Sequence, residues 1–322
     1  MNYPHKIPYE IKRVWIYNDV FPSDRPYKLV SCFLHKSYSL NLHTHDFYEI
    51  NFIVNGKGVH YTENGFKETK IGDIYVIPPG SYHGYHNIEN LDVYHLLIHK
   101  NFFYKYNNDF NMLSAFNILF NVDYKARKNE TMKDTISYSA NEAFDDLLNT
   151  FIKLDSIEYN TTFAPLTIDL NSSYLLSYSI AINIIVKLCE IYQTHYIKND
   201  SFDENYKSDI EMLKVLNFIH TNYHKKLTLE ELCNVSFSSK TSLTEKFKKY
   251  IGQSPLNYVN YYRVQMAKRL IIETEKSIST IAQETGFFDA SHLNKIYTKF
   301  EKKTPSELKD KLKRRNSNIK IN

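Results

Sequence analysis

A helical pattern is written twice between Leu227 and Lys311, and this repeat constrains the fold more than any other feature of the 322-residue chain. Similar residues recur at a spacing of 50 positions, and a short stretch upstream recurs at 49, so one copy carries a single extra residue. The matched pairs are Leu243 with Leu293, Phe247 with Tyr297, Lys249 with Lys299, Ser254-Pro255 with Thr304-Pro305, and Leu232-Cys233 with Ile281-Ala282. A small helical unit that occurs twice indicates a partner that also repeats, and duplex DNA is such a partner.

Each copy has the signals of a short helix, a turn and a second helix. Thr228 with Glu231 and Thr304 with Glu307 have capping-box spacing, in which side chain and backbone bond reciprocally. Gly286 is expected to take a positive φ in the second turn. We predict helices over 208–223, 228–233, 239–250, 255–272, 278–285 and 289–300. The arrangement is a helix-turn-helix, whose second helix enters the major groove of DNA.

The helix over 255–272 serves as a spacer between the two copies. It spans about 27 Å at the usual rise per residue. That length can hold two recognition helices close to one turn of B-DNA apart, about 34 Å. Both helices would then enter successive major grooves on one face of the duplex.

The last hundred or so residues resemble the AraC/XylS family of transcription regulators. The positions that carry the resemblance are Arg263, Ala267, Leu270, Ile271, Ile278, Ile281, Ala282, Gly286-Phe287, Leu293, Lys299 and Thr304-Pro305. The resemblance implies a cytoplasmic transcription regulator that binds double-stranded DNA, with activation as the expected role. RNA polymerase is a further candidate partner.

Base contacts are expected from exposed residues near the start of each recognition helix. The candidates are Lys240, Thr241, Thr244 and Glu245 in the first copy, and Ser291, His292, Asn294 and Lys295 in the second. The family often has arginine where Glu245 stands, and a glutamate cannot bind guanine, although it can accept from cytosine N4. Lys295 occupies the equivalent position in the second copy and can reach guanine or a phosphate. The second copy is therefore expected to carry more of the specificity.

Residues 38–99 have the composition and turn spacing of short β-strands. Ile50–Val54 and Ile74–Ile77 are predicted strands, and Asn55-Gly56 and Asn64-Gly65 are predicted hairpin turns. This pattern favours a small antiparallel barrel.

Two histidine-containing motifs lie within the predicted barrel and resemble those of cupins. The first has His43, His45, Glu49 and Gly56, with Ser37 where its leading glycine would stand, and the second has Gly72, Pro78, Gly80, His83 and Asn87. His43 and His45 alternate on one strand, so their side chains face the same way.

The resemblance to cupins implies that His43, His45, Glu49 and His83 hold a divalent metal. Such a set suits iron, manganese, nickel or zinc. The alternatives are that the four residues line a polar pocket for a small molecule such as a sugar, or only hydrogen-bond one another. Tyr48 belongs to the same candidate pocket. The neighbouring residues Tyr75, Tyr82, Tyr85, His86 and His95 add hydrogen-bonding surface.

The expected fold is α+β with two domains: an antiparallel cupin β-barrel with flanking helices, then an all-α domain with two helix-turn-helix units. We assign residues 1–105 to ligand sensing, 106–195 to helical packing and dimerisation, 196–207 to a linker, and 208–315 to DNA binding. Polar loops are expected over 124–134 and 159–164. Apolar residues of the helical segment recur at i, i+3, i+4 and i+7, as on one helix face. One expected helix has Phe144, Leu147, Leu148, Phe151 and Ile152, and a longer one, from 168 or 171 to 192, has Leu175, Leu176, Ile180, Ile184, Leu188 and Ile191. These helices favour a homodimer interface, although packing on the open side of the barrel is the alternative.

Charge follows the same division. Residues 208–322 hold 21 Lys+Arg against 12 Asp+Glu, whereas residues 1–207 hold 19 against 24. A basic C-terminal part indicates a polyanionic partner for that part alone.

The three cysteines are far apart and are expected to be reduced thiols. The most apolar run, 174–189, is interrupted by polar residues and predicts no membrane helix.

Two functions compete on this evidence. The first is a transcription regulator whose barrel senses a small molecule. The second is a metal-dependent cupin enzyme, an oxygenase or isomerase, with a helical appendage. Two helix-turn-helix units have little use in an enzyme, so the regulator is the preferred hypothesis and no catalytic residue is assigned.

Overall fold

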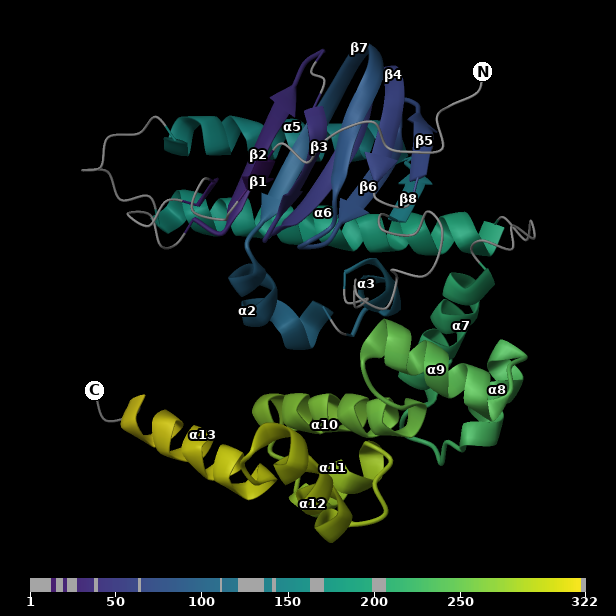
Figure 1. Ribbon diagram of the computed structural model, residues 1–322. Coiled ribbons are helices and arrows are strands. Elements are labelled where there is room, and N and C mark those ends of the chain that lie inside the picture. The colour runs from purple at the N-terminus through teal and green to yellow at the C-terminus, as the bar shows by residue number, and fades with distance from the viewer. Residues whose placement is uncertain are drawn as a thin grey trace. The chain divides into compact units, whose positions relative to one another are not determined.

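The computed structural model describes residues 13–15, 20–21, 28–37, 40–62, 65–110, 112–120, 136–140, 143–162, 171–198 and 207–319. The chain forms two compact units, Met1–Ser201 and Phe202–Asn322 (Figure 1). The finer division at residues 105, 195 and 207 stays a prediction. Most of the predicted linker, residues 199–206, lies outside the described part of the chain.

The N-terminal unit is built on one mixed sheet. Its strands are β1 (Arg13–Trp15), β2 (Val30–His35), β3 (Leu40–His45), β4 (Tyr48–Thr62), β5 (Gly65–Thr69), β6 (Asp73–Ile77), β7 (His83–Ile98) and β8 (Ile136–Ser139). The main path runs β1-β3-β7-β4-β6-β8, while β2 also pairs with β7 and β5 with β4. The cupin-like fold is confirmed, but the pairings among the described strands do not close into a barrel. The β1–β3 pair is parallel, so the sheet is not purely antiparallel.

The prediction of a hairpin turn at Asn55-Gly56 was wrong. Strand β4 continues through this dipeptide to Thr62, and its register against β7 shifts between Ile53 and Val59. Gly56 has a φ of 70°, and a Cβ there would lie 2.2 Å from the backbone oxygen of Asn90. The dipeptide is therefore a bulge where two backbones approach closely. Strands β4 and β5 pair with Thr62 opposite Gly65, and Asn64 of the second predicted turn lies outside the described residues.

Ser37, which stands where the cupin motif has its leading glycine, has a positive φ of the kind that glycine adopts easily. Its φ is 46°. Its backbone N–H donates to Asp92 Oδ1 at 3.1 Å. That hydrogen bond helps to hold a non-glycine residue in a region that side chains rarely adopt. The motif glycines Gly72 and Gly80 also have positive φ, at 90° and 83°.

In the described part of the chain, the helices that accompany the sheet are α2 (Lys100–Phe110), α3 (Ser114–Leu119), α5 (Phe144–Thr162) and α6 (Asn171–Lys198). Figure 1 shows the long helices α5 and α6 alongside the sheet. The predicted loop over 159–164 is helical as far as Thr162, and the predicted loop over 124–134 lies outside the described residues.

The predicted apolar stripe of α6 was partly wrong. Leu175 and Leu176 are exposed, while Tyr174 and Tyr178 are buried in their place. The reason is aromatic packing, because the Tyr178 ring meets Phe102 of α2 edge-on at 5.7 Å. On α5, Leu147 and Phe151 are buried as expected, whereas the predicted face residue Ile152 is exposed.

Helix α6 is longer than the apolar run in the sequence indicated. By length and composition alone, Asn171–Thr194 is long and apolar enough to cross a membrane. Half of its most apolar window is buried inside the unit, and α6 packs against α5, α3 and the sheet. It is therefore a core helix of the N-terminal unit.

The C-terminal unit consists of helices. They are α7 (Lys207–Asn222), α8 (Leu229–Ser236), α9 (Lys240–Ile251), α10 (Pro255–Glu273), α11 (Ile278–Glu284), α12 (Ala290–Glu301) and α13 (Pro305–Ile319). Both capping boxes form: Thr228 with Glu231, and Thr304 with Glu307, each with a backbone N–H bonded to the glutamate at 2.7 Å. The helices predicted from the repeat are therefore present, with ends that differ by a few residues. Leu256 at the start of α10 is exposed, whereas Val259 and Tyr262 of the same helix are buried.

The repeat extends to backbone conformation at the end of each recognition helix. Gly252 caps α9 with a φ of 76°, and Lys302, 50 residues later, caps α12 with a φ of 59°. Glycine adopts this left-handed conformation freely, whereas a side chain there is strained. Lys302 therefore carries a local cost that Gly252 does not.

We expect Lys302→Gly to stabilise the protein by about 0.5–1 kcal/mol, because the relieved strain exceeds the added entropy of the unfolded chain. Lys303→Gly is the matched control, since Lys303 is exposed and lacks a positive φ. The control should be neutral or destabilising. Urea unfolding of both variants checks the prediction, and equal effects would contradict it.

Candidate nucleic-acid interface and ligand pocket

The two recognition helices, α9 and α12, begin in the same way. Ser239 caps α9 and accepts from the backbone of Ser242 at 3.2 Å, while Asp289 caps α12 and accepts from the backbone of His292 at 2.7 Å. Each helix buries the matched pair of core residues, Leu243 with Phe247 and Leu293 with Tyr297. The opposite face of each helix is thereby presented to solvent.

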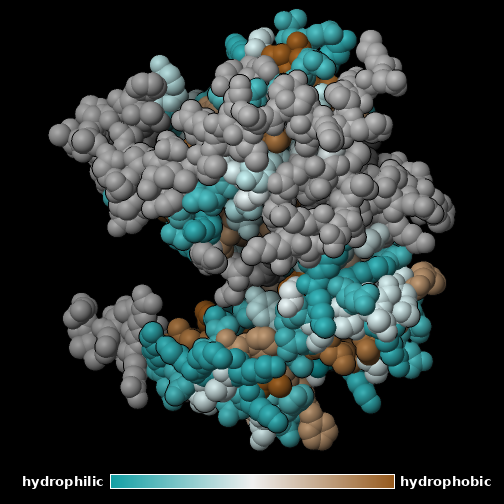
Figure 2. Space-filling model, viewed as in Figure 1, coloured by the Kyte–Doolittle hydropathy of each residue, from teal (hydrophilic) through white to brown (hydrophobic). Residues whose placement is uncertain are grey.

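Most of the predicted base-contact residues lie on these solvent faces. Exposed side chains are Lys240, Thr241 and Glu245 on α9, and Ser291, Asn294 and Lys295 on α12. Thr244 and His292 are half-buried. The Thr244 hydroxyl donates to the Lys240 carbonyl at 2.7 Å, and the His292 ring packs edge-on against Phe287 at 5.4 Å. The exposed face of the C-terminal unit seen in Figure 2 is mainly hydrophilic, as a surface that binds a polyanion requires.

We call the two helix-turn-helix units, α8–α9 and α11–α12, the first and the second reader. A buried arginine connects the spacer helix α10 to the segment after α7 and to the turn of the second reader. Arg263 of α10 donates to the carbonyl oxygen of Tyr223 at 2.8 Å and to that of Lys225 at 2.6 Å. Its guanidinium also lies 6.0 Å from the centre of the Phe287 ring. Burial lowers the pKa of this arginine. The two carbonyls offset the cost of burying the charge, so they fix α10 against the segment that follows α7.

Further polar contacts hold the second recognition helix to the spacer. Glu301 of α12 accepts from Lys268 at 2.6 Å and from Gln265 at 3.2 Å, both on α10. Lys299 reaches Asn257 of α10 at 3.3 Å. In the first copy, Lys246 of α9 is paired with Glu211 of α7. The readers are therefore anchored to the rest of the unit by side-chain pairs as well as by their cores.

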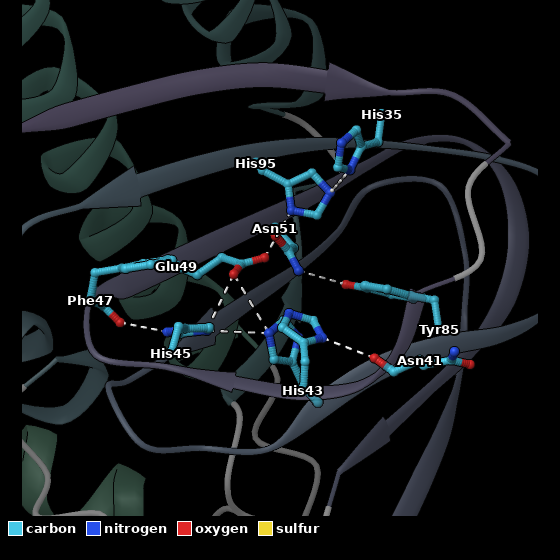
Figure 3. A network of polar contacts seen from close by, with 10 residues as sticks. His35, Asn41, His43, His45, Phe47, Glu49, Asn51, Tyr85 and His95 are labelled. Atoms are coloured by element: carbon cyan, nitrogen blue, oxygen red, sulfur yellow. Dashed lines mark hydrogen bonds and ion pairs between the residues drawn. The ribbon is translucent and has the colours of Figure 1, made fainter. Parts of the chain in front are cut away.

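In the N-terminal unit, Glu49 is the centre of a buried polar network (Figure 3). His95 Nδ1 lies 2.8 Å from Glu49 Oε1, and His45 Nε2 lies 3.2 Å from Glu49 Oε2. His83 Nε2 is 3.6 Å from the same Oε2 and 3.2 Å from His45 Nε2. His43 approaches closely enough that donor atoms of His43, Glu49 and His83 all lie within 4.8 Å of one another. The four predicted metal ligands are thus brought together.

Backbone carbonyls determine which nitrogens of these rings carry protons. His45 Nδ1 lies 2.7 Å from Phe47 O, and His43 Nδ1 lies 3.0 Å from Asn41 O. A proton on each Nδ1 donates to its carbonyl and leaves Nε2 as an acceptor. His45 Nε2 and Glu49 Oε2 then face each other as two acceptors. A cation between them would satisfy both, so the donor set fits a metal ion.

The protonation equilibria point the same way. Burial lowers the pKa of His43 to about 3 and that of His45 to about 4. Burial pushes the pKa of Glu49 up, but the charge of His83 and the hydrogen bonds from His83 and His95 pull it well below the usual value. The neutral imidazoles of His43 and His45 and the ionised carboxylate of Glu49 are in the forms that bind a divalent metal.

The structure adds residues that the sequence did not single out. His60 is buried, its ring lies 4.3 Å from Tyr75 and 5.8 Å from His83, and its Nε2 has no hydrogen-bond partner among the described residues. Asn51 donates to the Tyr85 hydroxyl at 3.0 Å, while its Oδ1 has no such partner. These orphaned polar atoms extend the candidate pocket, because a bound polar molecule can supply their missing hydrogen bonds.

Tyr48 does not belong to this pocket. Successive residues of a strand face opposite sides, and Glu49 is the inward one. The Tyr48 ring packs edge-on against Phe103 of α2 at 4.6 Å and lies 6.3 Å from the Phe120 ring. His35 lies at the other end of the network, with its Nδ1 3.2 Å from His95 Nε2.

Comparisons with known proteins agree with both halves of the structure. Residues 32–147 match the family model of an AraC-like ligand binding domain, and residues 232–311 match that of a helix-turn-helix domain. The chain is 24% identical over 267 residues to the transcriptional activator RhaS of Mannheimia succiniciproducens, covering 83% of this chain and 88% of that protein. It is 29% identical over 130 residues to the lactose operon transcription activator of Staphylococcus xylosus, covering 39% and 47%.

Among solved structures, an AraC-type transcriptional regulator from Chromobacterium violaceum matches at 25% identity, with a TM-score of 0.31. The match covers 33% of this chain and 94% of that one. The chain belongs to the AraC/XylS family of transcription regulators, with an N-terminal ligand-binding domain and a C-terminal DNA-binding domain. It is a DNA-binding regulator and not an enzyme, so the hypothesis of a cupin oxygenase or isomerase is set aside.

We expect Gly286→Ala to destabilise the C-terminal unit by more than about 3 kcal/mol, well beyond the usual effect of one substitution. Gly286 has a φ of 78°, and a Cβ there would lie 2.5 Å from the Tyr223 oxygen that Arg263 binds. Gly252→Ala is the matched control, because its φ is similar but its Cβ would meet open space. The control should cost about 1 kcal/mol, from strain alone. Chemical denaturation compares the two, and equal costs would rule out the crowding argument.

Proposed function

We propose that this protein activates transcription from DNA that it reads with two unequal helix-turn-helix units, under the control of a small polar effector bound near Glu49. The observation that carries the proposal is the pair of solvent-facing recognition helices held on one spacer helix. An effector controls DNA binding only if it binds the DNA-competent state with a different affinity from the other state. The activating role is supported by the similarity to proteins named as activators.

The two readers differ in charge where they face solvent. Lys295 on α12 and Glu245 on α9 are both exposed and occupy equivalent positions. An anion at Glu245 is repelled by phosphates, whereas Lys295 can bind a guanine edge or a phosphate. The unequal readers suit a DNA site with one strongly and one weakly specified half.

We expect Lys295→Ala to weaken binding to the DNA upstream of the protein's own gene by about tenfold or more, the value of one good base contact. Glu245→Ala should change affinity by less than about threefold, since no strong base contact is lost. Lys214→Ala, on the exposed side of α7, removes the same charge outside either reader and is the control. Fluorescence anisotropy at fixed salt measures all three. A larger loss at Glu245 than at Lys295 would reverse the assignment of roles.

The effector pocket is proposed to comprise His43, His45, Glu49 and His83, extended by His60 and Asn51. Its lining is rich in nitrogen donors and acceptors and holds one carboxylate. Such a lining suits a small molecule with several hydroxyl or carbonyl oxygens, and a sugar is one candidate.

A divalent metal is proposed to occupy the same set of residues. His43, Glu49 and His83 would hold it, with His45 as a fourth ligand. When bound, the metal supplies a Lewis-acid centre to which an oxygen atom of an effector can coordinate. The protein's own part is to keep the imidazoles of His43 and His45 neutral and the Glu49 carboxylate ionised.

We expect zinc, nickel or manganese to raise the melting temperature of the full-length protein, by mass action on the native state. At a free metal concentration 100 times Kd the gain is about 2.7 kcal/mol. His83→Gln should abolish the shift, whereas His99→Gln should keep it, because His99 is also buried but packs edge-on against Phe21 outside the network. Thermal scans after chelator treatment, with a parallel panel of sugars, make the measurement. A metal shift that survives in His83→Gln would exclude this site.

We further propose that the protein is a cytoplasmic homodimer that contacts RNA polymerase. Exposed apolar side chains on α5 and α6 support a dimer contact there: Ile152, Tyr159, Leu175 and Leu176. A dimer would remove these apolar side chains from water, which favours association. Sedimentation of the purified protein distinguishes a dimer from a monomer.

A further inference from the structure

Two phenylalanines stand almost fully in solvent beside the recognition helices. Phe237 is 94% exposed and Phe288 is 89% exposed, the two highest values among the large hydrophobic residues that the structure describes. Phe237 lies in the turn between α8 and α9, two residues before the cap of α9. Phe288 lies in the turn between α11 and α12, directly before the cap of α12. The same feature therefore occurs once in each reader.

Neither position is explained by packing. In the second turn the adjacent Phe287 enters the core, where it is 4% exposed, and leaves Phe288 outside. In the first turn the small residue Ser238 precedes the cap, and the aromatic ring comes one place earlier. The two turns differ by one residue, yet each keeps one ring in solvent.

The first ring is also held at a local cost. Phe237 ends α8 in the left-handed conformation, with a φ of 50°. Gly286 takes this conformation at the end of α11, with a φ of 78°. A bulky side chain with positive φ is strained, and such strain persists where the surrounding structure or function requires it. A glycine would adopt this conformation with less strain, so the turn itself does not require a phenylalanine at position 237. We therefore look for a role of the ring outside the fold.

The partner must meet both turns together with the starts of both recognition helices. In a helix-turn-helix, the recognition helix enters the major groove by its N-terminal residues while the first helix crosses the DNA backbone. The turn that joins the two helices therefore lies close to the edge of the groove. Deoxyribose rings are the apolar part of that edge, between charged phosphates. Lysines suit the phosphates, and an aromatic ring suits the sugar face.

We propose that Phe237 and Phe288 contact deoxyribose of the DNA backbone, one ring at the edge of each of the two major grooves. The contact adds affinity without charge and without reading sequence. Together with the phosphate contacts of neighbouring lysines, this apolar contact positions each helix-turn-helix unit on the DNA. This inference rests on the DNA-binding function and extends it to residues outside the recognition helices.

The test measures the affinity of full-length Phe237→Ala and Phe288→Ala for two labelled duplexes over a range of salt. One duplex comes from upstream of the protein's own gene, and the other is its scrambled sequence. Each variant should bind both duplexes about five- to tenfold more weakly, the effect of losing part of an aromatic contact area. The slope of log affinity against log salt should not change, because no phosphate contact is lost. Phe288→Leu should retain most of the affinity.

Two further variants separate this role from a structural one. Ile272→Ala removes an exposed apolar side chain from α10, outside both turns, and should leave affinity unchanged. Phe237→Gly should raise the melting temperature by relieving strain while it weakens DNA binding. A merely structural role would move stability and affinity in the same direction.

If the wild-type protein binds DNA and both alanine variants bind it with unchanged affinity, the inference is overturned. A fall in transcription without a change in DNA affinity would indicate that the rings contact a protein partner, and it would overturn the inference too. A loss confined to the upstream duplex would assign the rings to bases instead of sugars and would also overturn it. A wild-type protein that binds neither duplex would refute the DNA-binding function together with the inference.

Discussion

The backbone carbonyl of Tyr223 is the point at which three segments of the C-terminal unit meet. Arg263 of the spacer helix donates to it at 2.8 Å, and Gly286 of the second turn packs so closely that no Cβ fits between them. A buried guanidinium is tolerated only where carbonyls satisfy it. The second reader, the spacer helix and the end of α7 are therefore fixed to one another, and the spacing of the two readers becomes a property of the fold.

Glu49 has a comparable place in the N-terminal unit. A buried carboxylate stays ionised only with hydrogen-bond donors or cations around it, and three histidines from two strands, β3 and β7, surround this one. The two acceptors that face each other, His45 Nε2 and Glu49 Oε2, leave the network incomplete without a bound proton or cation. An incomplete buried network is a means by which a ligand can select one state of a regulator.

Much of this arrangement was predictable from the sequence, because it rests on local rules. Caps, turns and matched core positions located the recognition helices, and motif spacing brought His43 and His83 together. The failures have long-range causes. The bulge at Gly56 depends on the approach of Asn90 from another strand, and it changes which face later β4 residues occupy, so simple alternation could not place His60 beside the pocket. Tyr48 was wrongly assigned to the pocket, because alternate residues of a strand face opposite sides and its neighbour Glu49 is the one that faces the pocket.

The central claim is that α10 holds two readers at a fixed separation on one face of a duplex. Hydroxyl-radical footprinting of the full-length protein on its upstream DNA, followed by affinity for a duplex with about five extra base pairs between the protected segments, tests it most directly. The account predicts two protected segments about one helical turn apart and a large loss of affinity on insertion, because half a turn places the second groove on the opposite face. A single protected segment, or unchanged affinity after insertion, would contradict the claim.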